Sequence, residues 1–126
     1  MPSKIRNTIL LIEDDAFFGK VLSQRLDKVG LVVEIVSDGS KALEKALKVK
    51  PCLVLLDLIL PKKNGFDLLE EIRKTETLKK VHVMVLTNLG QKEDIEHMEK
   101  LGIKDYIVKA DHSLTEIVNK VIECLK

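Results

Sequence analysis

The sequence predicts an α/β fold in which helices cover both faces of a doubly wound, five-stranded parallel sheet. Two observations support this prediction: short apolar runs rich in Val, Ile and Leu recur along the chain, and segments with helical apolar spacing separate them. Strands that alternate with helices are joined by right-handed crossovers, which give a parallel sheet. Because 126 residues suit one domain with a full core, we expect a single domain over residues 1–126.

The five apolar runs are the expected strands. They are nearly continuous in aliphatic residues, as is typical of strands buried on both faces of a parallel sheet. In the second run Glu34 interrupts the apolar residues, which indicates a strand at the sheet edge. The runs occupy residues 9–12, 31–36, 52–56, 81–86 and 103–108.

The expected helices carry start and stop signals. In the first, Asp15 is a candidate N-cap and Gly30 supplies the stop. The second follows the turn SDGS and ends before Pro51, and the third is opened by Asn64 and Gly65.

The last two helices also have clear boundaries. Segment 91–102 has acidic residues in its first turns and Gly102 at its end, which suits the helix dipole. The final helix is expected from His112 or Ser113 to Leu125, where apolar residues recur at intervals of three and four.

Charge and cysteine usage exclude several classes of function. The 21 basic and 20 acidic residues give a formal charge of +1 without a basic tract, so we expect no direct nucleic-acid binding. The first apolar run is too short for a signal peptide or a membrane span, which predicts a cytoplasmic protein without membrane insertion. Cys52 and Cys124 show no metal-ligand spacing and are interpreted as reduced packing thiols.

Polar residues end four of the five expected strands. The first strand is followed by Glu13 and Asp14, the third by Asp57, the fourth ends at Thr87, and the fifth is followed by Lys109. With the sheet order 2-1-3-4-5, these side chains converge at one edge, where doubly wound sheets bind ligands. Burying an unpaired carboxylate costs several kcal/mol or more, so Asp57 requires a partner.

The clustered acids predict a bound cation, and a bound cation favours an anionic ligand. Carboxylates packed together repel one another unless a cation lies between them, and oxygen-only ligands favour Mg²⁺, with Mn²⁺ also possible. A phosphoryl group on Asp57 would supply an anionic ligand, because carboxylates can form acyl phosphates as nucleophiles. Lys109 and the Thr87 hydroxyl would then stabilise its charge. The sequence has no GxxxxGK[ST] and no GxGxxG, so a nucleotide site is not favoured.

Four sequence motifs resemble those of a known protein family. In order, ILLIEDD, LLDLILPKKNGFDLL, VLTNLG and KDYIVKAD resemble the receiver domain of two-component response regulators over essentially the whole chain. The resemblance implies a flavodoxin-like (βα)5 fold and a phosphoryl group that Asp57 accepts from a sensor histidine kinase or a histidine phosphotransfer protein. Such a protein catalyses its own phosphorylation and dephosphorylation but is not a conventional turnover enzyme.

The resemblance also implies a set of metal ligands. Asp14 and Asp57 would hold Mg²⁺ directly, with Glu13 helping through a water molecule. The backbone carbonyl of Ile59, two residues beyond the acceptor, would be the third protein ligand.

The remaining implied roles concern the phosphoryl group and the response to it. Thr87 would donate a hydrogen bond to a phosphoryl oxygen, and Lys109 would form an ion pair with it. Tyr106 is similar to the switch aromatic of the family, whose ring turns inward when Thr87 moves. Because the chain ends one helix after the fifth strand, the resemblance indicates a stand-alone receiver whose output is a surface for an unidentified downstream protein.

The sequence departs from the family pattern in three places. Ala110 follows Lys109 where the family usually has a proline in cis, so either the loop is strained or it is trans and Lys109 is aimed differently. Asn88 is larger than the small residue usual there and narrows access to the phosphoryl group. Neither Ile59 nor Leu89 can orient a water molecule, which predicts slow self-dephosphorylation.

Other interpretations of the same residues stay open. Asp57 and Lys109 could form a purely structural ion pair, Glu13 and Asp14 could cap a helix, and Tyr106 could be an ordinary packing residue. The main alternative function is a constitutive interaction module without phosphoryl transfer. A small hydrolase would need a general acid in the pocket, and the sequence offers no obvious candidate.

Overall fold

The structure, a computed structural model that describes residues 8–126, has the predicted parallel sheet. The strands are arranged in the order β2-β1-β3-β4-β5, which confirms the expected doubly wound topology. Residues 1–7 of the expected domain lie outside the described residues. The strands are β1 (Thr8–Ile12), β2 (Val32–Val36), β3 (Leu53–Leu56), β4 (His82–Thr87) and β5 (Asp105–Val108).

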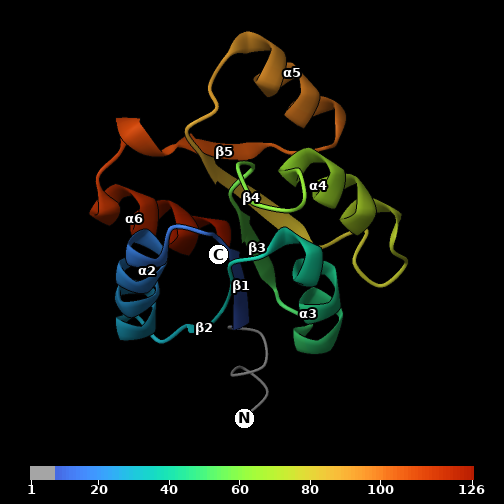
Figure 1. The fold of residues 1–126 in the computed structure, drawn as a ribbon. Coiled ribbons are helices and arrows are strands. Elements are labelled where there is room, and N and C mark those ends of the chain that lie inside the picture. Colours follow the sequence, from blue (N-terminus) through green and yellow to red (C-terminus); the bar gives the residue numbers. More distant parts are fainter. Residues whose placement is uncertain (1–7) are drawn as a thin grey trace.

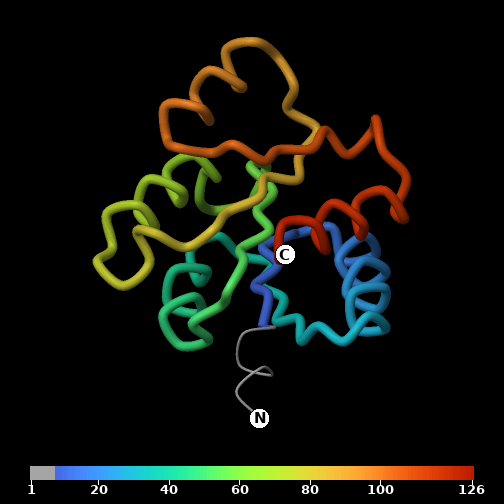
Figure 2. Tube along the Cα trace, turned by 180° about the vertical axis from the view of Figure 1, so that it is seen from behind, coloured from blue at the N-terminus to red at the C-terminus, as the bar shows by residue number. Residues whose placement is uncertain are grey.

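Helices cover both faces of this sheet (Figure 1). Helices α2 and α6 lie next to one another on one face, as both views of the chain show (Figures 1 and 2). Helices α3, α4 and α5 cover the other face. None of the helices in the described part of the chain is long and apolar enough to cross a membrane. Their bounds are α2 Ala16–Lys28, α3 Ala42–Val49, α4 Gly65–Lys74, α5 Lys92–Lys100 and α6 Leu114–Cys124.

The core has two layers, one on each face of the sheet. Along β1, Ile9 and Leu11 pack with α2 and α6, whereas Leu10 and Ile12 pack with α3, α4 and α5. Successive strand residues point to opposite faces, so a strand covered on both sides must be apolar throughout. All four residues of β3 are accordingly buried. The strand that precedes Asp57 is therefore fixed from both sides.

The predicted boundary signals act as expected. Asp15 is the N-cap of α2, and its carboxylate accepts a 3.0 Å hydrogen bond from the Phe18 amide. Gly30 and Gly102 follow α2 and α5 with φ of +93° and +81°, a left-handed backbone that favours glycine. The edge position predicted from Glu34 is also confirmed, since β2 ends the sheet.

The beginning of the last strand differs from the prediction. Residues 103 and 104 were included in the apolar run, but β5 begins at Asp105. The amide of Ile103 instead donates a 3.0 Å hydrogen bond to the carbonyl of Met98, which closes the end of α5. The buried side chain of Ile103 packs in the core although the residue lies in the turn that ends α5. Hydrophobic patterning cannot distinguish such a residue from one in a strand.

Ser113 begins α6 with a capping box, and removing its hydroxyl should destabilise the protein. Its Oγ accepts a 3.1 Å hydrogen bond from the Glu116 amide, and the Glu116 carboxylate accepts a 2.7 Å bond from the Ser113 amide. We expect Ser113→Ala to lower the free energy of unfolding by about 1 kcal/mol in urea denaturation. Ser23→Ala, inside α2, should be neutral or slightly stabilising, and an equal loss in both variants would contradict the capping role.

Candidate functional site

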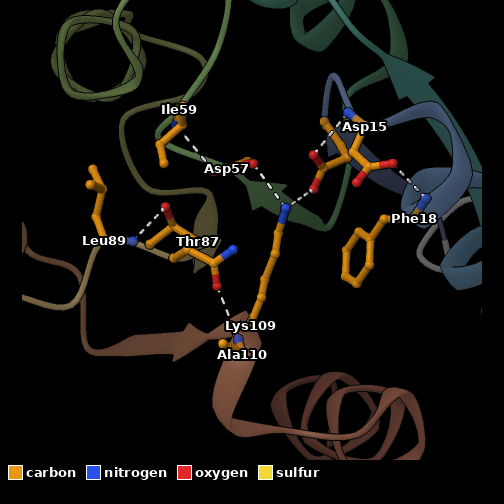
Figure 3. A network of polar contacts seen from close by, with 10 residues as sticks. Asp15, Phe18, Asp57, Ile59, Thr87, Leu89, Lys109 and Ala110 are labelled. Carbon is orange, nitrogen blue, oxygen red and sulfur yellow. Dashed lines mark hydrogen bonds and ion pairs between the residues drawn. The ribbon is translucent and has the colours of Figure 1, made fainter.

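The carboxyl ends of four strands bring the predicted site residues to one edge of the sheet (Figure 3). The Asp57 amide continues the pairing of β3 with β1 through a 3.0 Å hydrogen bond to the Ile12 carbonyl. Glu13 follows β1 in the same way, because its amide donates to the Val36 carbonyl at 2.9 Å. Both side chains are buried, with 6% of Asp57 and 2% of Glu13 exposed. Two buried carboxylates therefore lie within 4.8 Å of one another at the end of the sheet.

Lys109 supplies the partner that the buried acids require. It begins a short 3-10 turn after β5, and its side chain extends across the strand ends (Figure 3). The Nζ atom lies 2.9 Å from Asp57 Oδ2 and 2.6 Å from Glu13 Oε1. The ring of Phe18 lies under the ammonium group, 4.5 Å from Nζ to the ring centroid. The cation is thus held by two carboxylates and an aromatic face.

Burial sets the protonation of these groups. It raises the pKa of Glu13 to about 7, against the lowering effects of the Lys109 ammonium and the Asp15 amide. Burial also opposes the charged form of Lys109, but its contacts with Glu13 and Asp57 outweigh this, so the pKa of Lys109 is raised. The lysine is firmly charged, whereas Glu13 titrates near neutrality. One ammonium does not fully balance the acids around it.

The donor set fits a hard divalent cation. Glu13, Asp14 and Asp57 each place a carboxylate oxygen within 4.8 Å of the others, and Asp14 is exposed to solvent. Glu13 Oε1 is buried and, apart from its close ion pair with Lys109, has no hydrogen-bond partner. With three carboxylates facing one ammonium, a divalent ion would complete the charge balance. Oxygen-only donors suit Mg²⁺ or Mn²⁺.

Ile59 contributes its backbone to the Asp57 carboxylate. Its amide donates a 3.0 Å hydrogen bond to Asp57 Oδ1, while its side chain is 52% exposed beside the site. The two carboxylate oxygens of Asp57 are therefore held separately, one by this amide and one by Lys109. The role of the Ile59 carbonyl as a metal ligand stays a prediction.

Thr87 and Tyr106 lie on the neighbouring strands β4 and β5. Thr87 is the last residue of β4 and is buried, and its hydroxyl accepts a 3.3 Å hydrogen bond from the Leu89 amide. Tyr106 is half-buried and packs against the core layer under α3, α4 and α5. Tyr106 pairs in register with Val85, which lies two residues before Thr87 on β4. The two predicted switch residues are therefore close neighbours on adjacent strands. Their coupled movement stays a prediction.

The loop after β5 is trans and still delivers Lys109 to the acids. No peptide bond within the described residues is cis, so the bond between Lys109 and Ala110 is trans. The Ala110 amide donates a 3.0 Å hydrogen bond to the side-chain oxygen of Asn88, which joins the loops after β4 and β5. Asn88 and Ala110, two of the residues that depart from the family pattern, therefore contact one another.

Two site features were missed by sequence reasoning. Phe18 fits the pattern of a core residue of α2, but its ring also contacts the Lys109 ammonium. Gly65, expected only to open a helix, packs against the backbone of Leu58, and an added Cβ would lie 2.4 Å from the Leu58 Cα. Neither contact has a signal in local spacing, because both join segments brought together by the fold.

The fold and the edge residues together define a class of protein. A flavodoxin-like sheet of order 2-1-3-4-5 carries acids, a threonine and a lysine at its carboxyl edge. Residues 9–121 match the response regulator receiver domain family, and the chain belongs to this family. The resemblance of the four motifs is thereby confirmed.

Relatives and solved structures agree with this assignment. The chemotaxis protein CheY of Thermotoga maritima is 33% identical over 116 residues, which cover 90% of this chain and 95% of that protein. The non-phosphorylated receiver domain of HemR from Leptospira biflexa is 32% identical with a TM-score of 0.87, covering 96% of this chain and 95% of that one. The transcriptional regulator RpaA of Synechocystis is 36% identical over 101 residues, which are 80% of this chain and 42% of RpaA. The chain therefore spans about half the length, or less, of the transcriptional regulators that it matches.

Proposed function

We propose that Asp57 is the phosphoacceptor of a two-component or phosphorelay system in the cytoplasm. The donor would be a phosphohistidine on a sensor histidine kinase or a histidine phosphotransfer protein. The observation that carries this proposal is the Asp57 carboxylate itself, buried at the end of β3, in contact with Lys109 and beside two further acids. A structural ion pair alone would need Asp57 and Lys109 but would not require the extra carboxylates, which leave the site short of positive charge.

Each residue of the site would have a separate role in phosphoryl transfer. The Asp57 carboxylate forms the new O–P bond while the P–N bond of the donor breaks, and the leaving imidazole retains the electron pair and takes up a proton. Lys109, already 2.9 Å from Asp57, would pair with a phosphoryl oxygen, and the Thr87 hydroxyl, at the end of the neighbouring strand β4, would donate a hydrogen bond to another.

A bound metal ion would add positive charge for this reaction. Asp14, Asp57 and the Ile59 carbonyl would hold Mg²⁺ or Mn²⁺ directly, and Glu13 would help through water. When bound, the ion would neutralise charge on the transferring group. The three carboxylates that face a single ammonium group are the structural feature that supports its presence.

Phosphorylation would then change a partner-binding surface. The phosphoryl group adds a charge of about −1.5 to −2 near the end of β4, where Thr87 and Tyr106 would move together. The surface formed by α5, β5 and α6 lies next to these residues and would contact the downstream protein. A coupling of about 1 to 3 kcal/mol would change partner affinity roughly 5-fold to 150-fold.

Intact mass spectrometry with a small phosphodonor tests the proposal. In Mg²⁺ and acetyl phosphate, the protein should gain the mass of one phosphoryl group, and Asp57→Asn should gain none. Addition of EDTA should abolish the reaction of the native chain. If no adduct forms, or if Asp57→Asn still gains it, a constitutive interaction module becomes the better interpretation.

The apolar residue at position 59 should slow hydrolysis of the acyl phosphate. Because Ile59 cannot orient a water molecule and its exposed side chain lies beside Asp57, Ile59→Asn should shorten the phosphoryl half-life several-fold. Ile35→Asn is a matched control, since Ile35 is also exposed but lies on the edge strand β2. The half-life is read from loss of the phosphoryl mass after donor removal, and an unchanged value for Ile59→Asn would refute the prediction.

A further inference from the structure

A second cluster of potential ligands lies at the opposite edge of the sheet from Asp57. His82 begins β4, Asp105 begins β5, and Cys124 ends α6, whose last turn covers these two strand starts. Nε2 of His82 lies 2.6 Å from Oδ2 of Asp105, and the Cys124 Sγ lies 3.5 Å from each of these two atoms. Three residues distant in sequence thus direct a nitrogen, an oxygen and a sulfur at one point.

We propose that His82, Asp105 and Cys124 form a binding site for a zinc-type transition-metal ion, separate from the phosphorylation site. Imidazole, thiolate and carboxylate are the three side-chain donors that zinc uses in proteins. The thiol and imidazole make the cluster chemically unlike the all-oxygen site at Asp57 and suit a softer ion than Mg²⁺.

The spacing of the three atoms is close to that of a tetrahedral site. With Zn–N and Zn–O bonds of about 2.0 Å and a Zn–S bond of about 2.3 Å, a tetrahedral site places the nitrogen and oxygen about 3.3 Å apart and the sulfur about 3.5 Å from each of them. Both distances to the Cys124 sulfur, 3.5 Å, already have this value. The His82 to Asp105 distance of 2.6 Å is that of a hydrogen bond and would lengthen when an ion replaces the shared proton. A small side-chain adjustment is therefore sufficient.

The site is accessible and has room for further ligands. The side chains of His82 and Asp105 are each 43% exposed, so an ion can enter from solvent. The cluster lines a surface hollow of about 480 Å³ bordered by Lys104, Lys120 and Glu123, which leaves space for a water molecule in the fourth position. With one carboxylate and one thiolate bound, a divalent ion would be electrically balanced.

Without an ion the three side chains hold one another through hydrogen bonds. Burial, followed by the charge of Asp105, raises the pKa of the Cys124 thiol to about 11, so the sulfur carries its proton and donates it to Asp105. Metal binding would release this proton, as it does at other thiolate sites. Bound metal would then join the end of α6 to the starts of β4 and β5.

Cobalt substitution tests the site directly. The native chain, in Mg²⁺ sufficient to saturate the acidic site, should bind one equivalent of Co²⁺ with a thiolate-to-metal charge-transfer absorption in the near ultraviolet, and Zn²⁺ should displace it. Cys124→Ser should lose this absorption. The matched control Cys52→Ser should keep it, because the Cys52 thiol donates to the Thr8 carbonyl and is not one of the three clustered donor groups.

Affinity measurements assign the other two ligands. Removing a ligand should cost more than the 10- to 100-fold typical of residues that only support one, so His82→Asn and Asp105→Asn should weaken Zn²⁺ binding more than about 100-fold. His112→Asn should leave the affinity unchanged. Each variant should still accept a phosphoryl group on Asp57, which reports an intact fold independently of the metal. Absence of the charge-transfer absorption in the native chain, or its persistence in Cys124→Ser, would overturn the proposal.

Discussion

Replacing Lys109 with methionine should destabilise the protein by about 3 kcal/mol in metal-free buffer above pH 7. Methionine keeps the length and apolar contacts of the side chain but removes the charge that lies between Asp57 and Glu13. Removing one partner of a buried ion pair leaves uncompensated buried charge, which typically costs about 3 to 5 kcal/mol. Urea denaturation in EDTA measures the loss, and saturating Mg²⁺ should recover part of it by replacing the missing positive charge.

The loss should shrink as the pH falls. The folded-state pKa of Glu13, about 7, is above its ordinary value of 4.5, and removing Lys109 takes away a contact that lowers it. The folded variant therefore binds more protons than the unfolded chain between these values. The contribution of Glu13 to the stability of the variant is fully present below about pH 4.5 and is lost as the pH rises through a folded pKa that is higher than in the native chain. Because Glu13 of the native chain titrates at about 7, the difference in stability between the two proteins grows above that pH. Adding Glu13→Gln should restore stability at pH 8 and flatten the pH dependence.

A surface lysine provides the comparison for Lys109→Met. Lys79 pairs with Glu76 on the exposed surface at 3.2 Å, and exposed pairs contribute at most about 1 kcal/mol. Lys79→Met should therefore change stability by less than about 0.5 kcal/mol at every pH. If Lys109→Met behaves like Lys79→Met, solvent rather than the lysine balances the acidic site. Of these two variants, Lys109→Met alone should also slow phosphorylation by acetyl phosphate, because the Nζ atom of Lys109 lies 2.9 Å from Asp57.

The sheet was predictable because its signals are local and mutually consistent. Aliphatic runs, helix caps such as Asp15 and stops such as Gly30 each act within a few residues. The alternation of elements and the edge signal at Glu34 restrict the strand order, and the resemblance to receiver domains implies the order 2-1-3-4-5 that the structure has. Strand boundaries were less predictable where a buried apolar residue lies outside a strand. Ile103 is an example, because its amide bonds to the end of α5 while its side chain packs in the core.

The convergence of the acids and the lysine at one edge of the sheet was predictable from the sequence, but not all of their contacts were. Parallel strands end at a common edge, so residues that follow them must meet there, and Asp57, Glu13 and Lys109 do. Which side chains contact one another depends on how far each extends in the folded protein. The cation–π contact between Phe18 and Lys109 therefore had no signal in the sequence. The His82 and Cys124 cluster was hidden for the same reason, since these two residues are 42 positions apart.

Replacing Gly65 with alanine should destabilise the protein by several kcal/mol and impair phosphorylation. Gly65 opens α4 directly against the chain that follows Asp57, and its amide donates a 3.1 Å hydrogen bond to the Leu58 carbonyl. A Cβ at this position would lie 2.4 Å from the Leu58 Cα and 2.7 Å from its carbonyl oxygen, distances that real Cβ atoms do not show. Because both contacts are backbone, no side-chain rotation can relieve them, so the segment must move.

That movement would reach Asp57 directly, because one peptide bond joins Leu58 to Asp57 and another joins it to Ile59. Leu58 separates Asp57 from Ile59, whose amide fixes the orientation of the Asp57 carboxylate. Gly65→Ala should therefore slow phosphorylation even in buffer where the variant remains folded, and its rate is measured by intact mass at low temperature.

Gly19→Ala makes the same chemical change with the opposite expected result. Gly19 is buried inside α2, and the nearest atom to an added Cβ is the Glu13 Cγ at 3.7 Å, an ordinary contact. Alanine is favoured over glycine in helix interiors by about 0.5 to 1 kcal/mol, so this variant should be more stable than the native chain. Because Gly19 also lies beside the acidic site, a loss of stability there comparable to that of Gly65→Ala would show that the whole site, rather than the Leu58 backbone, is intolerant of added volume.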